Sequence, residues 1–399
     1  MRRRAFRLSM CWLSLVCVPA WAGTTLREAV DQAWERAVAA RVAESRRAEA
    51  DASRAVADSW FAEPPSIGLA EKSDRFNNNR GLRERELDVA LPLWLPGQRA
   101  AREGFAARDA ADAQAGLAAA RLALAGDVRA AVWNLAAAQA ELDIAAERLA
   151  TAEKLEIDVA RRQMAGDLAR TDLLLAQEET LTAQGALTEA RTRQRQAMGR
   201  LQVLTGLDSM PSSIDETVSP EANAMHPRAA LAQASVELAR ANLEVAQADR
   251  RNPPELSIGV VQTRDDFAAP SYKTVRLGLR FPLGTDARNA PKLAVANSVV
   301  IKAEAELQQT LSEIEIEQQS AQLALENAQS LYRSAQTRAT LAAERLALQE
   351  KAFSLGELSL AEFMRMRATA DEARLEQLRA RSTLGAARAQ FNQAKGLLP

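Results

Sequence analysis

Cysteine, histidine and aromatic residues are scarce in this chain of 399 residues. It has two cysteines and one histidine, and aromatic residues make up only 4% of the sequence. Both cysteines, Cys11 and Cys17, lie within the first 22 residues, so the rest of the chain has no disulfide, no thiol nucleophile and no thiolate metal site. The single histidine, His226, cannot build a zinc site or a histidine-based catalytic triad without partners.

The recognisable motifs of enzymes and nucleic-acid-binding proteins are also missing. The sequence contains no nucleophile elbow, no Gly-rich phosphate loop and no paired acids in a recognisable pocket pattern. No strongly basic patch appears, and the formal net charge is −1. We therefore expect no enzymatic activity, no cofactor, no bound metal and no nucleic-acid partner.

Residues 1–22 have the pattern of a signal peptide. An apolar run over 8–18 precedes Ala20-Trp21-Ala22, a small-x-small cleavage site, and the run is too short to span a bilayer as a helix. Val16 stands before Cys17 where a lipobox requires Gly or Ala, so we expect cleavage without lipidation; an uncleaved anchor is the alternative. Cleavage removes four arginines and no acid, which changes the net charge from −1 to −5. The four arginines are Arg2, Arg3, Arg4 and Arg7.

The composition of the remaining chain predicts long packed helices instead of several globular domains. Hydrophobic residues make up 47% of the sequence, and alanine contributes more of them than phenylalanine, isoleucine and valine do, while charged residues make up 26%. Ala-rich sequence with Glu, Arg and Gln at helical periodicity is typical of long helices. Small side chains let such helices approach closely, which favours sheets of helices over one thick core.

The sequence repeats itself about 190 residues apart. Four landmarks recur in the same order with a separation of 189 or 190 residues. They are Pro64-Pro65 with Pro253-Pro254, Leu91-Pro92-Leu93 with Phe281-Pro282-Leu283, Gly166 with Gly356, and Gly206-Leu207 with Gly396-Leu397. A repeat of this length indicates a duplicated unit within one structure, so we predict a first repeat over 23–206, a linker over 207–226 and a second repeat over 227–399.

Each repeat is predicted to contain a helix, two strands, a long helix and a further helix. In the first, proline ends a helix over 25–61, strands cover 66–72 and 85–93, and helices cover 96–165 and 171–204. In the second, helices cover 227–251, 290–355 and 359–395, and strands cover 255–264 and 272–283. A helix of roughly 70 residues is about 100 Å long. The helices 25–61 and 171–204 together match that length, so we expect them to meet near mid-height, beside the linker and the C-terminus.

The predicted strands alternate between large apolar residues and polar, charged or small ones. Leu, Val, Ile and Phe side chains share one face, and the opposite face carries Glu84, Glu86, Asp88, Arg276 and Arg280. Apolar-out, charged-in alternation over about ten residues is typical of transmembrane barrel strands. An open four-stranded sheet is forbidden in a bilayer, so other copies of the chain must close it. Two copies give eight strands with a filled interior, and three give twelve strands with a lumen. The alternative is a soluble coiled-coil protein with a small β-domain.

On these features, the sequence resembles the TolC-like outer-membrane efflux factors over essentially the whole chain after residue 22. The most specific segments are Gly166-Asp167-Leu168-Ala169-Arg170-Thr171-Asp172 and Gly356-Glu357-Leu358-Ser359-Leu360-Ala361-Glu362, which are similar to the family's periplasmic tip motif. His226-Pro227 at the start of the second repeat also resembles the family pattern. Within the family, the similarity is greatest to the CusC/CzcC type of cation-efflux protein.

The resemblance implies a mainly α fold with a small β part. Long antiparallel helical hairpins would form an α-barrel across the periplasm, and four strands per chain would complete a twelve-stranded barrel in a homotrimer surrounded by outer-membrane lipid. The tip would dock on a periplasmic adaptor and, through it, on an inner-membrane pump of the proton-driven RND type or the ABC type. The location would be the outer membrane of a Gram-negative bacterium.

The resemblance also implies a gate at the tip turns, formed by Gly166, Arg170, Asp172, Gly356, Glu362 and Arg365. Asp172 and Glu362 would place six carboxylates around the tip of a trimer, where they could attract cations or form salt bridges to Arg170 or Arg365. The alternative is that both acids start helices and complement the helix dipole. Arg365 and Leu358 depart from the family's pattern, which has a second acid and an arginine there in some relatives.

We therefore predict a passive exit duct of a tripartite efflux system that exports metal cations or small toxic compounds. The rival function is a periplasmic coiled-coil adaptor or scaffold without a channel. Adaptors insert a single hairpin into small β-domains, whereas this sequence duplicates a helix–strand–strand unit.

Overall fold

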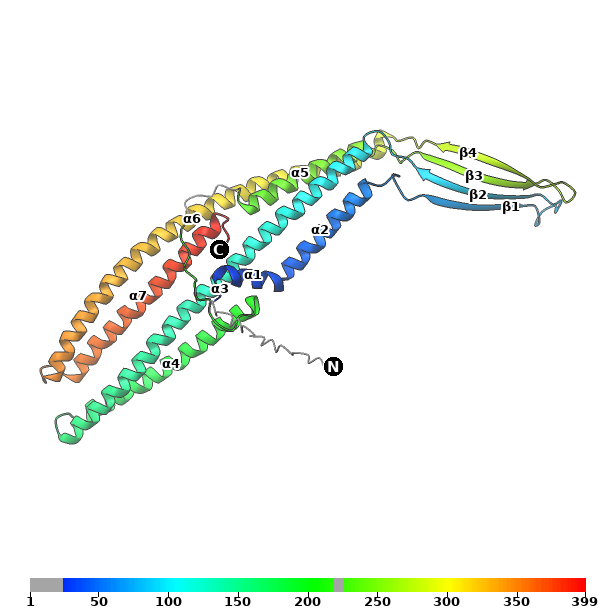
Figure 1. Cartoon of the computed structure of the whole chain (residues 1–399). Coiled ribbons are helices and arrows are strands. Elements are labelled where there is room, and N and C mark those ends of the chain that lie inside the picture. The colour runs from blue at the N-terminus through cyan, green and yellow to red at the C-terminus, as the bar shows by residue number, and fades with distance from the viewer. Residues whose placement is uncertain (1–23, 219–224) are drawn as a thin grey trace, which may run out of the picture.

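The protein is a long rod with a small sheet at one end (Figure 1). The computed structural model describes residues 24–218 and 225–399, so the predicted signal peptide lies outside the described residues. Among the helices of these two ranges, none combines the length and the apolar character needed to cross a membrane.

The described residues form seven helices and four strands, in the predicted order except that two helices replace the first predicted one. In the first half they are α1 (Leu26–Arg36), α2 (Val38–Ala57), β1 (Ser66–Ser73), β2 (Arg83–Pro92), α3 (Gln98–Ala165) and α4 (Arg170–Thr205). In the second half they are α5 (Pro227–Ala248), β3 (Glu255–Arg264), β4 (Tyr272–Arg280), α6 (Asp286–Ser354) and α7 (Leu360–Ala394).

The long helices α3 and α6 run from the sheet to the far end of the rod, where they turn back into α4 and α7 (Figure 1). The helices α4 (36 residues) and α7 (35 residues) cover about half of that length, and α2 (20 residues) and α5 (22 residues) cover less. In the half near the sheet, packed neighbours follow the order α2, α3, α5, α6, and in the far half they follow the order α4, α3, α7, α6. The predicted stacking of two short helices against one long helix is therefore present.

Alanine dominates the buried helix surfaces. Ala29, Ala33, Ala125 and Ala183 are each at most 1% exposed. The largest buried cluster lies at mid-length, where α1 and the end of α4 pack on α3 around Val128, Val132, Leu135 and Leu201. Because alanine protrudes little, it allows neighbouring helices to pack closely without a thick core.

The helix predicted over 25–61 is divided in two. Thr25 and Glu28 form a capping box, since Glu28 Oε2 accepts from the Thr25 backbone N at 2.7 Å and Thr25 Oγ1 accepts from the Glu28 N at 3.3 Å. Ala37 then adopts an extended conformation with ψ 137° and ends α1. The break lets α1 contact both α3 and α4, whereas α2 follows α3 toward the sheet. The prediction of one continuous helix over 25–61 was therefore wrong. Ala37 is neither proline nor glycine, so the sequence did not indicate the break.

Two further boundaries differ from the prediction. β4 ends at Arg280 instead of residue 283, because Pro282 lacks the N–H that a strand ladder needs. α6 begins at Asp286 and keeps Pro291 within its first two turns, so it is longer at its start than predicted.

Candidate functional site

The four strands form one antiparallel sheet in the order β1-β2-β3-β4. Residues paired across the strands share a face, and the register puts Ile67, Val89, Ile258 and Leu277 in one row and Leu69, Leu87, Val260 and Val275 in the next. Most of these side chains are at least 40% exposed. One face of the sheet is therefore an uncovered apolar surface.

The opposite face carries the charged residues that the sequence singles out. The register places Glu84, Glu86, Asp88, Arg276 and Arg280 together on it. Glu86 and Arg276 form an ion pair across the strands, and Arg280 lies 3.5 Å from Glu255.

Two glycines make room for Asp88 in this charged face. A Cβ on Gly68 would lie 2.5 Å from Asp88 Oδ1, and one on Gly259 would lie 3.0 Å from Asp88 Cβ. A side chain at position 68 would displace the Asp88 carboxylate, and one at position 259 would press on Asp88 Cβ and on the Leu87 carbonyl. The charged face is thus built around the carboxylate of Asp88, with small neighbours on both adjacent strands.

Both outer edges of the sheet are unpaired within the described part of the chain. β1 pairs only with β2, and β4 pairs only with β3. Each edge presents a row of backbone N–H and C=O groups that can extend the sheet onto another chain.

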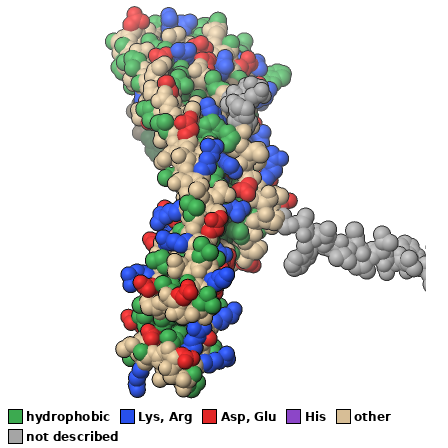
Figure 2. All heavy atoms as spheres, turned by 90° about the vertical axis from the view of Figure 1, so that its left-hand side faces the viewer, with side chains coloured by type: hydrophobic (Ala, Val, Ile, Leu, Met, Phe, Trp, Pro, Cys, Tyr) green, Lys and Arg blue, Asp and Glu red, His purple; other side chains and the backbone are tan. Residues whose placement is uncertain are grey.

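The helices also have two uncovered edges, and these continue the edges of the sheet. On one side lie α2 and α4, and on the other lies α6 along the whole rod. Exposed large apolar side chains follow both edges: Val38, Val42 and Val56 on α2, Leu174 and Leu181 on α4, and Ile316, Leu323, Leu341 and Leu348 on α6. Figure 2 shows hydrophobic side chains interspersed with charged ones over the face it presents.

The far end of the rod consists of two tight turns. Gly166 (φ 87°) and Gly356 (φ 77°) both adopt the left-handed conformation that favours glycine. After each turn, the next backbone N–H closes onto the preceding helix: Asp167 N donates to Arg162 O at 2.9 Å, and Glu357 N to Ala352 O at 3.0 Å. The two turns are equivalent in backbone structure as well as in sequence.

Asp172 and Glu362 both stabilise the start of the helix that follows their turn. Asp172 Oδ2 accepts from the Ala169 N at 3.0 Å, and Glu362 Oε2 accepts from Ser359 Oγ at 3.0 Å. Neither acid forms an ion pair with Arg170 or Arg365 among the residues that the structure describes. Within one chain, the interpretation as helix-start residues accounts for their contacts, and a gating role stays a proposal.

An apolar cluster joins the two hairpins just behind the turns. Phe353 of α6 and Phe363 of α7 stack with ring centroids 4.8 Å apart, and both belong to a cluster that includes Val159 and Ala176 of the first hairpin. The guanidinium carbon of Arg162 lies 5.3 Å from the Phe353 ring centroid. The hairpin ends are therefore packed against each other within one chain.

Charged side chains line the interface between the hairpins further from the turns. Arg148 donates to Glu179 at 2.7 and 3.0 Å, and Arg374 donates to Glu147 at 2.6 Å. Beside them, burial raises the pKa of Asp371, and burial lowers the pKa of Arg367. All of these groups except Glu179, which pairs with Arg148 inside the first hairpin, line a cavity of about 190 Å³ between α3, α6 and α7.

At mid-length, the segment after α4, the end of α7 and the middle of α3 meet at a buried arginine. Arg129 donates to both carboxylate oxygens of Glu216, at 2.8 and 2.6 Å, and also to Gln393 Oε1 at 2.6 Å and to the Leu397 carbonyl at 3.0 Å. Its side chain is only 3% exposed. Asn392 Nδ2 donates to the same Glu216 at 3.0 Å. We call this set of contacts the waist node.

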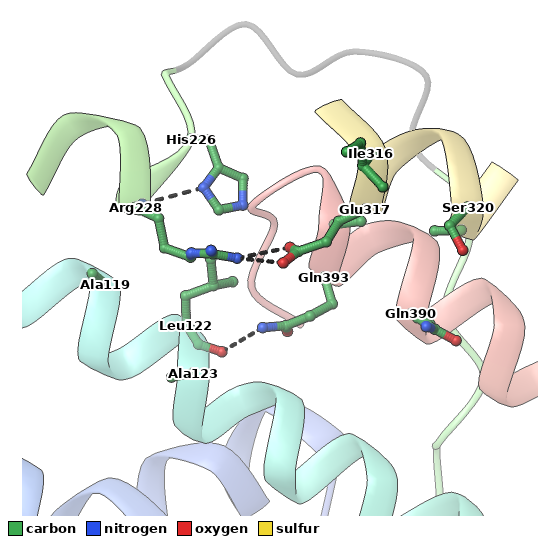
Figure 3. Close-up of a pocket in the computed structure, with 12 residues that line it drawn as sticks. Ala119, Leu122, Ala123, His226, Arg228, Ile316, Glu317, Ser320, Gln390 and Gln393 are labelled. Carbon is green, nitrogen blue, oxygen red and sulfur yellow. Dashed lines mark hydrogen bonds and ion pairs between the residues drawn. The ribbon is translucent and has the colours of Figure 1, made fainter. Parts of the chain in front are cut away.

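His226 lies at the rim of a cavity of about 370 Å³ near the waist node (Figure 3). Its Nδ1 accepts from the Arg228 backbone N at 3.2 Å and so caps the start of α5. The Arg228 guanidinium binds both oxygens of Glu317 at 2.8 and 2.7 Å. Burial and the charge of Arg228 lower the pKa of His226. His226 is therefore the residue that caps the start of α5.

Sequence reasoning missed the waist node and the contact between Trp133 and Gly385. Arg129 and Glu216 are 87 residues apart, and no local pattern relates them. Trp133 of α3 lies where a Cβ on Gly385 of α7 would be, 1.9 Å from its Cη2. The one available signal was the glycine inside the predicted helix over 359–395.

Comparison with known proteins identifies the fold. No protein-family model and no curated protein matches the sequence. Among solved structures, the outer membrane channel CmeC of Campylobacter jejuni superposes with a TM-score of 0.75 at 15% identity, over 93% of this chain and 85% of CmeC. The outer membrane protein VceC of Vibrio cholerae gives 0.74 at 16% identity, over 93% and 96%. CusC, described by its transmembrane channel formation, gives 0.76 at 17% identity, over 96% of both chains.

These similarities extend over nearly the full length of each structure. The chain therefore has the fold of the TolC-like outer-membrane channels, mainly α with a small antiparallel sheet, as the sequence predicts. At this level of identity, the comparison establishes the fold alone.

Proposed function

We propose that three copies of this chain form the outer-membrane exit duct of a tripartite efflux system. The observation that carries this proposal is the sheet with two open edges, one apolar face and one charged face. In a bilayer every strand edge needs a partner, and only a closed barrel provides one. The fold shared with proteins described as outer membrane channels supports the same conclusion.

The two edges of the chain favour a ring of copies. β1 lies on the same side as α2 and α4, and β4 lies on the same side as α6. One side of each copy would therefore pair with the opposite side of the next, a heterologous contact that closes into a ring when the rotation allows. Three copies give twelve strands, the smallest number that leaves a lumen, lined by the charged face with Glu84, Glu86 and Asp88.

In this assembly the helices would extend the lumen through the periplasm. The tip turns at Gly166 and Gly356 would dock on a periplasmic adaptor, which would connect the duct to an RND or ABC pump in the inner membrane. The proposed gate consists of the tip residues Asp172 and Glu362 with Arg170 and Arg365 from neighbouring hairpins. Cargo would be metal cations or small toxic compounds, with selection residing in the pump because a passive duct contacts cargo weakly.

The test is to express the full chain in a Gram-negative host, extract the outer membrane in mild detergent and determine the assembly by cryo-electron microscopy. We expect a trimeric hollow cylinder with a short barrel on a long helical tube, and ion conductance after reconstitution in a planar bilayer. A monomer, or a soluble rod without a barrel, would contradict the duct.

The rival is a periplasmic coiled-coil adaptor or scaffold. The exposed apolar face of the sheet argues against it, because a soluble β-domain would cover Leu69, Leu277 and their neighbours. Fractionation separates the two functions: the duct is expected in the outer membrane, and an adaptor in the periplasm or the inner membrane.

A further inference from the structure

The apolar face of the sheet changes its chemistry abruptly toward the strand ends that carry the two connecting loops. Along this face, the three rows of paired residues that contain Leu91, Val89 and Leu87 are apolar on each strand that they cross. The next row is Glu71, Arg85, Gln262 and Lys273, and the row after it contains Ser73, Arg83 and Arg264. Rows on one face are two residues apart, about 6.6 Å along a strand.

These two rows hold four cations and one acid, all on the face that is otherwise apolar. We call Arg83, Arg85, Arg264 and Lys273 the basic rim. Glu71 lies 2.6 Å from Arg83 and 3.7 Å from Arg85, so one carboxylate is shared between two guanidinium groups. The side chains of Arg83 and Arg85 remain 44% and 53% exposed, and Lys273 is exposed. The rim therefore keeps a net positive charge that faces outward.

The loop next to the rim helps to hold Arg264 in place. Its guanidinium carbon lies 5.5 Å from the Phe267 ring centroid, and its Nε donates to the Gly81 carbonyl at 3.3 Å. Among the described residues, the other two guanidinium nitrogens of Arg264 donate no hydrogen bond and form no ion pair. A planar guanidinium is the side chain best suited to a phosphate, because it can donate two parallel hydrogen bonds.

The position of the basic rim indicates which kind of ligand it binds. The rim borders an apolar band on the same face, and it lies at the end of the sheet that is remote from the helices (Figure 1). A surface that binds lipid chains in its band and phosphate at its border matches an amphiphile with an anionic head group. We infer that the basic rim binds phosphate groups of lipid head groups in the outer leaflet of the membrane. This inference rests on the proposed function, which places the sheet in the outer membrane; in a trimer the rim would supply twelve cations around the barrel.

The experiment measures binding of bisphosphorylated lipid A to the purified assembly in mild detergent by native mass spectrometry. Lipid A without phosphates and inorganic phosphate are the comparison ligands. The test variant is R83Q/R85Q/R264Q/K273Q. The matched control is R47Q/R161Q/R191Q/R333Q, which removes four exposed helical cations outside the sheet.

The wild type and the control are expected to bind bisphosphorylated lipid A in preference to the phosphate-free lipid, and the rim variant to bind it at least about tenfold more weakly. Equal binding by the rim variant, or no preference for the phosphorylated lipid, would overturn the inference while leaving the duct intact. If inorganic phosphate at matched concentration competes equally well with bisphosphorylated lipid A, the basic rim binds a free anion instead of a lipid. That result would also overturn the inference. A wild type that is not recovered from the outer membrane as an oligomer would instead refute the proposed function, and the inference with it.

Discussion

Nη2 of Arg129 lies 2.6 Å from Oε2 of Glu216, and this pair is the most buried ion pair among the described residues. It ties the middle of α3 to the segment between the two halves of the chain, and Gln393 and Asn392 attach the end of α7 to the same point. Three segments distant in sequence thus depend on one guanidinium group.

Replacing Arg129 by Met is expected to destabilise the protein by about 3–5 kcal/mol, because it leaves the largely buried Glu216 carboxylate without a cation to pair with. Removing both charges in R129M/E216M should recover part of the loss. Chemical unfolding of the detergent-solubilised protein measures the free energy of unfolding. The control is R338A, which breaks an exposed pair with Glu376 and should cost no more than about 1 kcal/mol. Equal effects of R129M and R338A would contradict a structural role for the waist node.

The contact of Trp133 with Gly385 predicts an unusual glycine substitution. Alanine in place of glycine inside a helix ordinarily stabilises by about 0.5–1 kcal/mol. At position 385 the new Cβ would overlap the Trp133 ring, so G385A should instead destabilise by about 1–3 kcal/mol. Gly199 in α4 has open space around its Cβ direction, and G199A serves as the control. Thermal unfolding of both variants tests this prediction. A melting temperature for G385A at or above that of the wild type would contradict the packing of Trp133 against Gly385.

The tip acids predict an effect on conductance. D172A/E362A removes an acceptor from the start of α4 and of α7, each worth about 0.5–2 kcal/mol, and should loosen both tip turns. We expect higher single-channel conductance of the isolated protein in a planar bilayer. D167A/E357A removes the same charge beside the turn glycines and should leave conductance closer to the wild type. Unchanged conductance in D172A/E362A would exclude these acids from the gate.

His226 predicts a pH dependence of stability. Burial and the neighbouring Arg228 lower its pKa from the ordinary 6.5, and its Nδ1 must be unprotonated to cap α5. As pH falls from 6.5 through the folded-state pKa, the unfolded chain binds the proton first, so the free energy of unfolding decreases. Well above pH 6.5, His226 is neutral in both the folded and the unfolded chain and contributes no pH dependence to the free energy of unfolding.

Because the chain has one histidine, NMR of histidine-labelled protein carrying a histidine-free affinity tag reports this pKa directly. The variant H226N keeps a side-chain acceptor at the helix start and should remove the acid-side loss of stability. A titration midpoint at or above 6.5 would contradict the role assigned to burial here.

Much of the fold could be predicted because its signals are local. The alternation of Leu87 and Val89 with Glu86 and Asp88 indicates a strand with two unlike faces, and Gly166 and Gly356 mark the two turns. Ala37 could not be predicted as a break, since alanine favours helices and the interruption serves the packing of α1 on α3 and α4.

The candidate site was predictable only in part. The charged face of the sheet follows from period two, but the ion pair between Glu86 and Arg276 depends on the register between separate hairpins. In the sequence, Arg129 cannot be distinguished from other charged helix residues, and only the fold places Glu216 beside it. Contacts between residues so distant in sequence are set by the whole assembly of helices, which no local window contains.

The open edges of β1 and β4 have a kinetic consequence. If the chain forms the proposed duct, a single copy cannot enter the hydrocarbon of the outer membrane with two rows of unpaired backbone groups, so association must precede or accompany insertion. The rate at which newly exported chains reach the membrane should then rise more steeply than linearly with their concentration. At low expression, unassembled copies would accumulate in the periplasm, where proteases and chaperones compete with assembly for the exposed sheet.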